Sequence, residues 1–277
     1  MRVALTGASG LVGGFVLNAA QAAGHSVTRL DRGTGFRLGD EPDLSGHDAL
    51  IHCAFAHVPG LYRGGEGDDP EQFYRLNADG TKRLFDAAVR DGVRQVVFLS
   101  SRAVHDGHAP GTTLPDGLPA RPANLYGRVK AAAEAYLASL PVTGTSIRAT
   151  GVYGPGAANK WQGLFDDYRS GRPVPPRVAT EVHGDDLAAA ILLVLDARTG
   201  LGAVNCSDLI LDRHDLLNQV RLLTGCPHSL PDRADPSPLR VQICDGLRGL
   251  GWIPGGMAKL RATLPGLLSL HDTGPKN

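Results

Sequence analysis

The sequence predicts an α/β protein in which a doubly wound parallel sheet carries helices on both faces and a small lobe follows at the C-terminal end. Segments with strand character alternate with segments of helical spacing from residue 2 to about residue 150. The strand segments are continuous apolar runs, which are typical of strands buried on both faces of a parallel sheet. Repeated strand–helix–strand units favour this arrangement because their crossovers place helices on the faces.

The first 157 residues contain most of these units and are predicted to form one domain. The expected strands are 2–6, 26–31, 49–53, 95–100 and 145–150, and the expected helices are 11–23, 71–90 and 126–140. After Gly151 prolines become frequent, and residues 158–277 are expected to form the smaller lobe. Helix 185–196 and strand 203–206 are expected to return to the main sheet, and a further helix is predicted over 212–223.

Composition narrows the class of protein. Lysine plus arginine equals aspartate plus glutamate, so nothing in the charge favours a nucleic-acid or membrane-surface partner. The four cysteines contain no CxxC pair, which favours reduced thiols in the cytoplasm, and no signal peptide or membrane-spanning run is seen. No metal site is expected, and His105 and His108 are interpreted as surface histidines.

A glycine-rich loop joins the first strand to the first helix. Gly7, Gly10 and Gly13 lie in the segment TGASGLVGG, and the amides of Leu11 and Val12 open the helix. A pyrophosphate binds well at a helix N-terminus, where the dipole favours an anion and glycines let the backbone come close. The segment therefore predicts a dinucleotide-binding domain of the Rossmann type.

The next strand ends on Asp31, where a carboxylate accepts hydrogen bonds from the adenine ribose. A carboxylate at this position repels a 2′-phosphate, so NAD is the expected cofactor. Arg32 leaves NADP open, because its guanidinium would pair with that phosphate.

A second set of polar residues predicts the chemistry. Ser100 and Ser101 end a strand, while Tyr126 and Lys130 are four residues apart on an expected helix and so share a face. A nearby ammonium lowers the pKa of a tyrosine from its usual value of about 10. The tyrosine would then act as a base while a serine hydroxyl holds the reacting oxygen.

These residues resemble the extended short-chain dehydrogenase/reductase family, also called the NAD-dependent epimerase/dehydratase family. The matching motifs run in order as TGASGLVG, ALIHCA, LNADGT, FLSSRAV, LYGRVK, IRATGVYGPG and VHGDDLAAAI. The resemblance implies that Tyr126 is the general base and acid, that Lys130 binds the nicotinamide ribose, and that Ser101 is the catalytic serine. It also implies that Ala54 and Asn77 lie beside the cofactor and that the chain forms a homodimer through helices 71–90 and 126–140.

The departures from the family pattern bear on the substrate. Gly151 stands where many nucleotide-sugar members have Asn, and Ala179 stands where many have Arg. His105 replaces the usual tyrosine of a V-Y-G turn, and Arg102-Ala103 replaces the Asp-Glu pair typical of dehydratases. Gly151 and Ala179, together with a short lobe, favour a smaller sugar or sugar-like substrate, whereas Arg102-Ala103 places a dehydratase below an epimerase.

Three functions remain open at this point. The first is an NAD(P)-dependent oxidoreductase that transfers hydride at a hydroxyl or carbonyl carbon of a sugar-like small molecule. The second is an NAD-dependent sugar or nucleotide-sugar epimerase with no net redox change, and the third is a non-catalytic dinucleotide sensor. Residues without an assigned role are Arg63, Lys160, Trp161 and His183, of which Trp161 is expected to pack and His183 to be structural.

Overall fold

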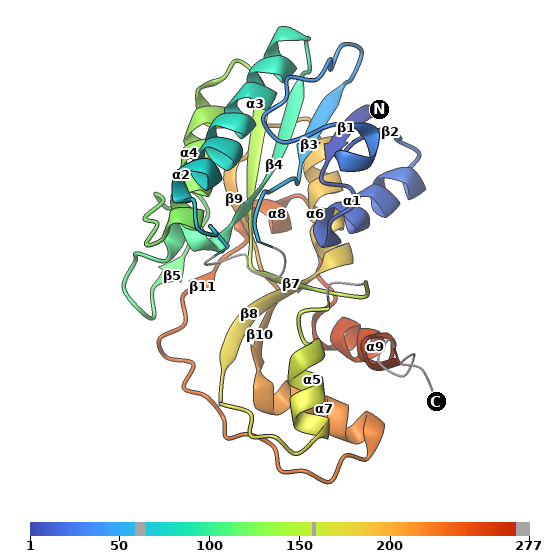
Figure 1. Cartoon of the computed structure of the whole chain (residues 1–277), viewed down its shortest axis with the longest axis vertical. Coiled ribbons are helices and arrows are strands. Elements are labelled where there is room, and N and C mark those ends of the chain that lie inside the picture. The colour runs from blue at the N-terminus through green and yellow to red at the C-terminus, as the bar shows by residue number, and fades with distance from the viewer. Residues whose placement is uncertain (59–64, 157–158, 270–277) are drawn as a thin grey trace.

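The computed structural model describes residues 1–58, 65–156 and 159–269. Its centre is a sheet of six parallel strands in the order β2-β1-β3-β4-β6-β9 (Figure 1). The strands are β1 (Arg2–Thr6), β2 (Ser26–Leu30), β3 (Ala49–His52), β4 (Gln95–Ser101), β6 (Thr143–Ala149) and β9 (Gly202–Cys206). This confirms the predicted α/β class with a parallel sheet, with strand ends that differ by one or two residues.

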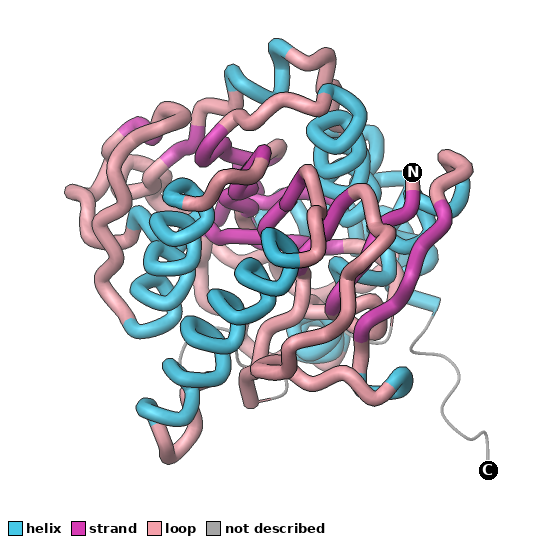
Figure 2. The backbone as a smooth tube through the Cα atoms, turned by 90° about the horizontal axis from the view of Figure 1, so that it is seen from above, coloured by secondary structure: helices cyan, strands magenta, loops and turns pink. Residues whose placement is uncertain are grey.

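Helices cover both faces of this sheet, as Figure 2 shows from above. Helices α1 (Leu11–Ala22) and α6 (Gly184–Ala197) pack together on one face, and α3 (Gly80–Arg90) and α4 (Leu125–Ser139) pack together on the other. Alternate residues of β1 enter the two cores, because Val3 and Leu5 join one hydrophobic cluster and Ala4 joins the other. The strand is therefore buried on both sides, as its apolar run predicts.

The single helix predicted over 71–90 is wrong in detail. The segment consists of α2 (Pro70–Tyr74), a π-helical turn η2 (Arg75–Asp79) and α3. The π turn contains Asn77, whose side chain bonds backbone groups outside the helix. Hydrophobic spacing does not report such an insertion, because the apolar stripe continues through it.

The C-terminal half builds a second, smaller layer below the sheet (Figure 1). Strands β7 (Gly151–Tyr153), β8 (Val178–His183) and β10 (Leu209–Asp212) form a three-stranded sheet in the order β10-β8-β7. They are accompanied by α5 (Gln162–Arg169), α7 (Arg213–Thr224) and α9 (Gly256–Ser269), whose apolar residues share one cluster. The remaining short elements are η1 (Arg32–Thr34), η3 (Arg102–His105), β5 (Thr113–Leu114), β11 (Val241–Gln242) and α8 (Asp245–Gly249).

Sequence reasoning missed the three-stranded sheet, because its strands are only three to six residues long. Helix α6 packs on α1, and β9 is the edge strand of the six-stranded sheet. Part of the C-terminal half of the chain therefore belongs to the main sheet and its helices. No helix in the described ranges is long and apolar enough to cross a membrane.

Candidate active site

The chain reverses its direction of winding at β1, since β2 lies on one side of it and β3 on the other. In open α/β sheets a ligand binds outside the carboxyl ends of the strands at such a point. The glycine loop follows β1 there, and Cys53 and Ala54 follow β3. The fold therefore brings the predicted cofactor residues to one edge.

The glycines of the loop are required by close approach of the backbone. Gly7 has a left-handed φ of 73°, and a Cβ on it would lie 2.6 Å from the backbone nitrogen of Ala54. A Cβ on Gly13 would lie 2.0 Å from the carbonyl oxygen of Gly7. A Cβ on Gly10 would meet that oxygen at 3.3 Å, so packing restricts this position less. Gly10 instead caps helix α1 without a side-chain hydrogen bond.

The N-terminus of helix α1 is a suitable binding site for an anion. Its first turn holds no acidic residue, and Leu11 and Val12 are half-buried there. Because the N-terminal amides of a helix lack partners within the helix, a pyrophosphate satisfies them. The loop and this helix end fit a dinucleotide.

Asp31 is buried and already has partners. Its Oδ1 accepts from the amides of Gly33 and Thr34, and its Oδ2 accepts from Arg29 Nη2 at 2.7 Å. The hydrogen bond from Arg29 holds the pKa of Asp31 below its usual value, so the carboxylate is ionised at neutral pH. Arg32 is exposed. The role of Arg29 was missed, although residues two apart on a strand share a face.

Asn77 is almost completely buried and clamps the loop after β3. Its Oδ1 accepts from the amide of Ala56 at 2.7 Å, and its Nδ2 donates to the carbonyl oxygens of Ala56 at 2.8 Å and Phe73 at 2.9 Å. Ala54 is fixed by a bond from its amide to Thr6 Oγ1 at 3.1 Å. The Asn77 side chain therefore fixes the conformation of the loop that contains Ala54 and Ala56.

The two serines at the end of β4 point to different surroundings. Ser100 is buried and its hydroxyl bonds the Glu134 carboxylate. Ser101 is half-buried and caps η3, where its Oγ accepts from the amide of Ala103 at 3.2 Å. Because side chains alternate along a strand, the two serines point to opposite faces of the sheet.

Tyr126 and Lys130 lie one turn apart on α4, and Phe55 contacts both. The Tyr126 and Phe55 rings meet edge to face at 5.1 Å, and Lys130 Nζ lies 4.4 Å from the centre of the Phe55 ring. Gly127 lets this end of α4 approach η3, because a Cβ on it would lie 2.6 Å from the carbonyl oxygen of Ala103. The predicted tyrosine and lysine are therefore brought against the segment that starts at Ser101.

Lys130 is the most perturbed amine of the site. It is 3% exposed, and Nζ donates to the carbonyl oxygen of Leu99 at 2.8 Å. Burial lowers the pKa of Lys130 to about 7, and the nearby Glu134 opposes that shift. An ammonium has three donors, so donors remain for a ligand.

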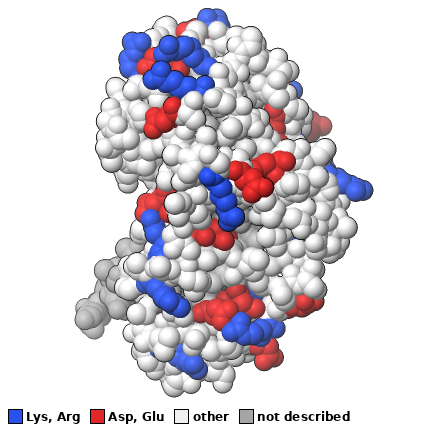
Figure 3. All heavy atoms as spheres, turned by 180° about the vertical axis from the view of Figure 1, so that it is seen from behind, with Lys and Arg blue, Asp and Glu red and all other residues white. Residues whose placement is uncertain are grey.

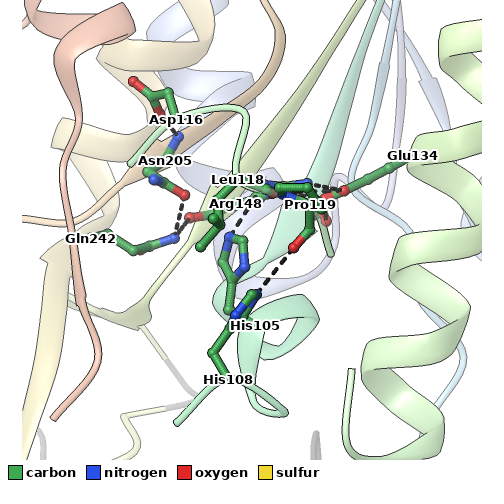
Figure 4. A network of polar contacts seen from close by, with 10 residues as sticks. His105, His108, Asp116, Leu118, Pro119, Glu134, Arg148, Asn205 and Gln242 are labelled. Atoms are coloured by element: carbon green, nitrogen blue, oxygen red, sulfur yellow. Dashed lines mark hydrogen bonds and ion pairs between the residues drawn. The ribbon is translucent and has the colours of Figure 1, made fainter. Parts of the chain in front are cut away.

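The interpretation of His105 as a surface residue is wrong, because it is fully buried at the end of η3. Its Nε2 lies 3.2 Å from Arg148 Nη1, within a network of polar contacts that also includes Glu134 (Figure 4). Burial and the positive charge of Arg148 lower the pKa of His105 to about 4. Sequence reasoning missed this because nothing marks an arginine within a strand as buried.

The space above Gly151 is filled from the lobe. A Cβ on Gly151 would lie 2.5 Å from Glu181 Oε2 and 2.8 Å from Lys160 Nζ, and these two side chains form an ion pair. Glu181 is 9% exposed and Lys160 30%. Gly151 lies two residues after Ala149, which is opposite Ser101 in the register of β6 and β4. The ion pair therefore flanks the carboxyl edge of the sheet.

The other residues without an assigned role are structural or outside the described residues. Trp161 is buried and stacks on Tyr153 at 5.0 Å. His183 caps α6 by accepting from the amide of Asp185, and its Nε2 lies 3.1 Å from Thr263 Oγ1. Arg63 lies outside the described residues.

The NAD dependent epimerase/dehydratase family model matches residues 3–206, and the chain belongs to this family. It is 28% identical over 242 residues to UDP-glucose 4-epimerase of Vibrio cholerae, covering 77% of this chain and 71% of the relative. A UDP-glucose 4-epimerase of Thermotoga maritima solved with UDP-glucose shares the fold, with a TM-score of 0.80 at 19% identity over 98% and 99% of the chains. The Thermus thermophilus UDP-glucose 4-epimerase complex with NAD gives a TM-score of 0.71 at 25% identity over 97% and 99%.

The chain is therefore an NAD-dependent enzyme of the extended short-chain dehydrogenase/reductase type. The resemblance inferred from the motifs is confirmed, as is the Rossmann-type sheet. The glycine loop fits this cofactor, as does the N-terminus of α1, which has no side-chain capping hydrogen bond.

Proposed function

We propose that the chain transfers hydride at a hydroxyl or carbonyl carbon of a sugar or sugar-like substrate, with Tyr126, Lys130 and Ser101 as its catalytic residues. We assign cofactor contacts to the loop glycines, the amides of Leu11 and Val12, Asp31 with Arg32, Ala54, and the Ser100 strand end. Their convergence on one edge of the sheet carries the proposal.

Tyr126 takes the proton of the substrate hydroxyl and returns it in the reverse direction. The Lys130 ammonium, one turn along α4, favours the phenolate electrostatically and offers donors to ribose hydroxyls. Ser101 holds the reacting oxygen by a hydrogen bond. Bound NAD supplies the hydride acceptor, and its reduced form the donor.

Replacing Tyr126 with Phe tests this mechanism. Turnover should fall by about 100-fold or more, because a positioned acid–base group contributes at least that much. Affinity for NAD, measured by calorimetric titration, should stay within about twofold. Turnover that survives in Tyr126→Phe would require another base.

Two substrate classes are candidates, and the ion pair above Gly151 separates them. Burial raises the pKa of Glu181 and Lys160 opposes this shift. Because the Lys160 ammonium is already paired with Glu181, it is less available to a diphosphate, which favours a neutral, hydroxyl-bearing group at this place. The second candidate is a nucleotide-sugar epimerase with no net redox change, which the relatives favour because their names state UDP-glucose 4-epimerase. A dinucleotide sensor is disfavoured, because both the tyrosine and the lysine are present.

Titration with UDP and UDP-glucose distinguishes these candidates. If the pair excludes anions, Glu181→Gln should strengthen UDP binding about tenfold and Lys160→Met should weaken it. Asp167→Asn, which removes an exposed acid of α5, is the matched control and should change nothing. Tight UDP binding that is indifferent to Glu181→Gln would instead select the nucleotide-sugar epimerase.

We further propose a cytoplasmic homodimer with a small-molecule substrate and neither nucleic acid nor membrane as partner. The four cysteines are free thiols, which suits a reducing compartment. Leu76, in the turn that precedes α3, is 37% exposed. Light scattering should find a dimer that Leu76→Glu dissociates, while Ile253→Glu, which changes a solvent-facing side chain elsewhere, should leave it intact. A monomeric wild type would contradict the dimer.

A further inference from the structure

Glu134 is a buried acid beside the site to which the catalytic steps assign no role. It follows Lys130 by one turn of α4 and is 7% exposed. Arg148 of β6, 4% exposed, donates through Nη2 at 2.8 Å and through Nε at 3.0 and 3.2 Å to its two oxygens (Figure 4). A buried ion pair is seldom more stabilising than apolar side chains of similar size, so stability alone does not account for it.

Glu134 connects this ion pair to the end of β4. Glu134 accepts the hydroxyl of Ser100, while Lys130 donates to the carbonyl oxygen of Leu99. Two side chains one turn apart on α4 thus hold the two consecutive residues that precede Ser101. Arg148 lies directly opposite Ser100 in the sheet register.

Arg148 connects the ion pair to the C-terminal end of η3. Arg148 Nη1 lies 3.2 Å from His105 Nε2 and donates to the carbonyl oxygen of Leu118 at 2.9 Å. A guanidinium has no acceptor, so His105 Nε2 accepts and its proton lies on Nδ1. The segment from Ser101 to His105 is therefore held at both ends by one ion pair.

We propose that Glu134 and Arg148 are positioning residues that align the Ser101 segment with Tyr126 and Lys130 and keep Lys130 in its ammonium form for cofactor binding. The alignment is mechanical, through Ser100 and His105. The charge effect is electrostatic, through the single helical turn between Glu134 and Lys130. Neither part depends on which sugar is the substrate.

The groups around Lys130 determine the pH at which its ammonium loses a proton. The groups that face it are Cys53 and His52 from the end of β3, Glu134 and Tyr126 from α4, and the rings of Phe55 and Phe98. Burial lowers the pKa of Lys130 and Glu134 opposes this shift. Removing the charge of Glu134 should therefore move the Lys130 titration to lower pH.

The decisive variant is Glu134→Leu/Arg148→Met, which replaces the pair by apolar side chains of similar length. It should fold, because no charge is left unpaired, although Ser100, His105 and the carbonyl oxygen of Leu118 lose hydrogen-bond partners. NAD affinity, titrated calorimetrically from about pH 6 to about pH 9, should fall about tenfold with its midpoint shifted down. Hydrogen exchange in residues 101–105 should accelerate. A folded double variant with wild-type affinity, midpoint and exchange would overturn the proposal.

Single variants of Glu134 distinguish the effect of its charge on the pH midpoint from the effect of its size. Glu134→Asp keeps the charge and should keep the midpoint, whereas Glu134→Gln should shift it although Arg148 is left unpaired. Asp86→Asn is the control. Asp86 lies on α3 and accepts a hydrogen bond from Tyr136 of α4 at an exposed position. An equal shift in Asp86→Asn and Glu134→Gln would show that no specific coupling exists.

Discussion

At the scale of single residues, the site combines groups that burial has moved away from their ordinary chemistry. Lys130 is enclosed by two aromatic rings and a carbonyl oxygen. The pKa of Cys53, raised to about 12 by burial, keeps that neighbour a neutral thiol at physiological pH. The amine is therefore the group of this cluster that titrates near neutrality.

The stability of the protein should record this titration. The unfolded chain keeps the Lys130 proton until about pH 10.5, whereas the folded chain releases it near pH 7. Between these values the unfolded state binds more protons, so the free energy of unfolding rises with pH, by up to about 1.4 kcal/mol per pH unit.

Urea denaturation at about pH 7 and about pH 8.5 checks this expectation. The rise should be present in wild type and absent in Lys130→Met. The same pH dependence in both proteins would mean that other groups cause it. His52, whose pKa burial lowers to about 3, titrates below this window.

At the scale of elements, the turn from β1 into α1 shows what the sequence predicts well. The glycine spacing predicted a tight turn at a helix start, and the structure explains it by the contact of Gly13 with the Gly7 carbonyl. The Asn77 turn could not be foreseen, because Asn77 forms a pair of hydrogen bonds with Ala56, which lies 21 residues earlier in the chain. Nor could Glu134 and Arg148 be paired without knowing that β6 lies beside β4.

Adjacent glycines of α1 provide a matched test of the turn. Gly13→Ala forces a Cβ to within 2.0 Å of a backbone oxygen, whereas a Cβ on Gly14 meets its nearest oxygen at 3.9 Å. Gly13→Ala should lose about 1–3 kcal/mol of stability and about tenfold in NAD affinity. Gly14→Ala should retain both, or gain up to about 1 kcal/mol. Equal effects of the two substitutions would contradict the close-approach argument.

At the scale of the whole molecule, the parallel sheet followed from apolar periodicity, whereas the lobe did not. Strands β7, β8 and β10 are three to six residues long, and they become a sheet only because β8 pairs in parallel with β7 and antiparallel with β10. The face in Figure 3 carries basic and acidic side chains next to one another, in keeping with a net charge of zero. We therefore expect recognition by charge to depend on local pairs such as Lys160 with Glu181 rather than on an overall field.

The most direct test of the central claim identifies the cofactor. Purified protein would be denatured, the released nucleotide identified by mass spectrometry, and emptied protein titrated with NAD and NADP. The proposed site predicts that NAD binds and that NADP binds at least about tenfold more weakly, because the ionised Asp31 repels a 2′-phosphate. Failure of both dinucleotides to bind, or tighter binding of NADP, would contradict it.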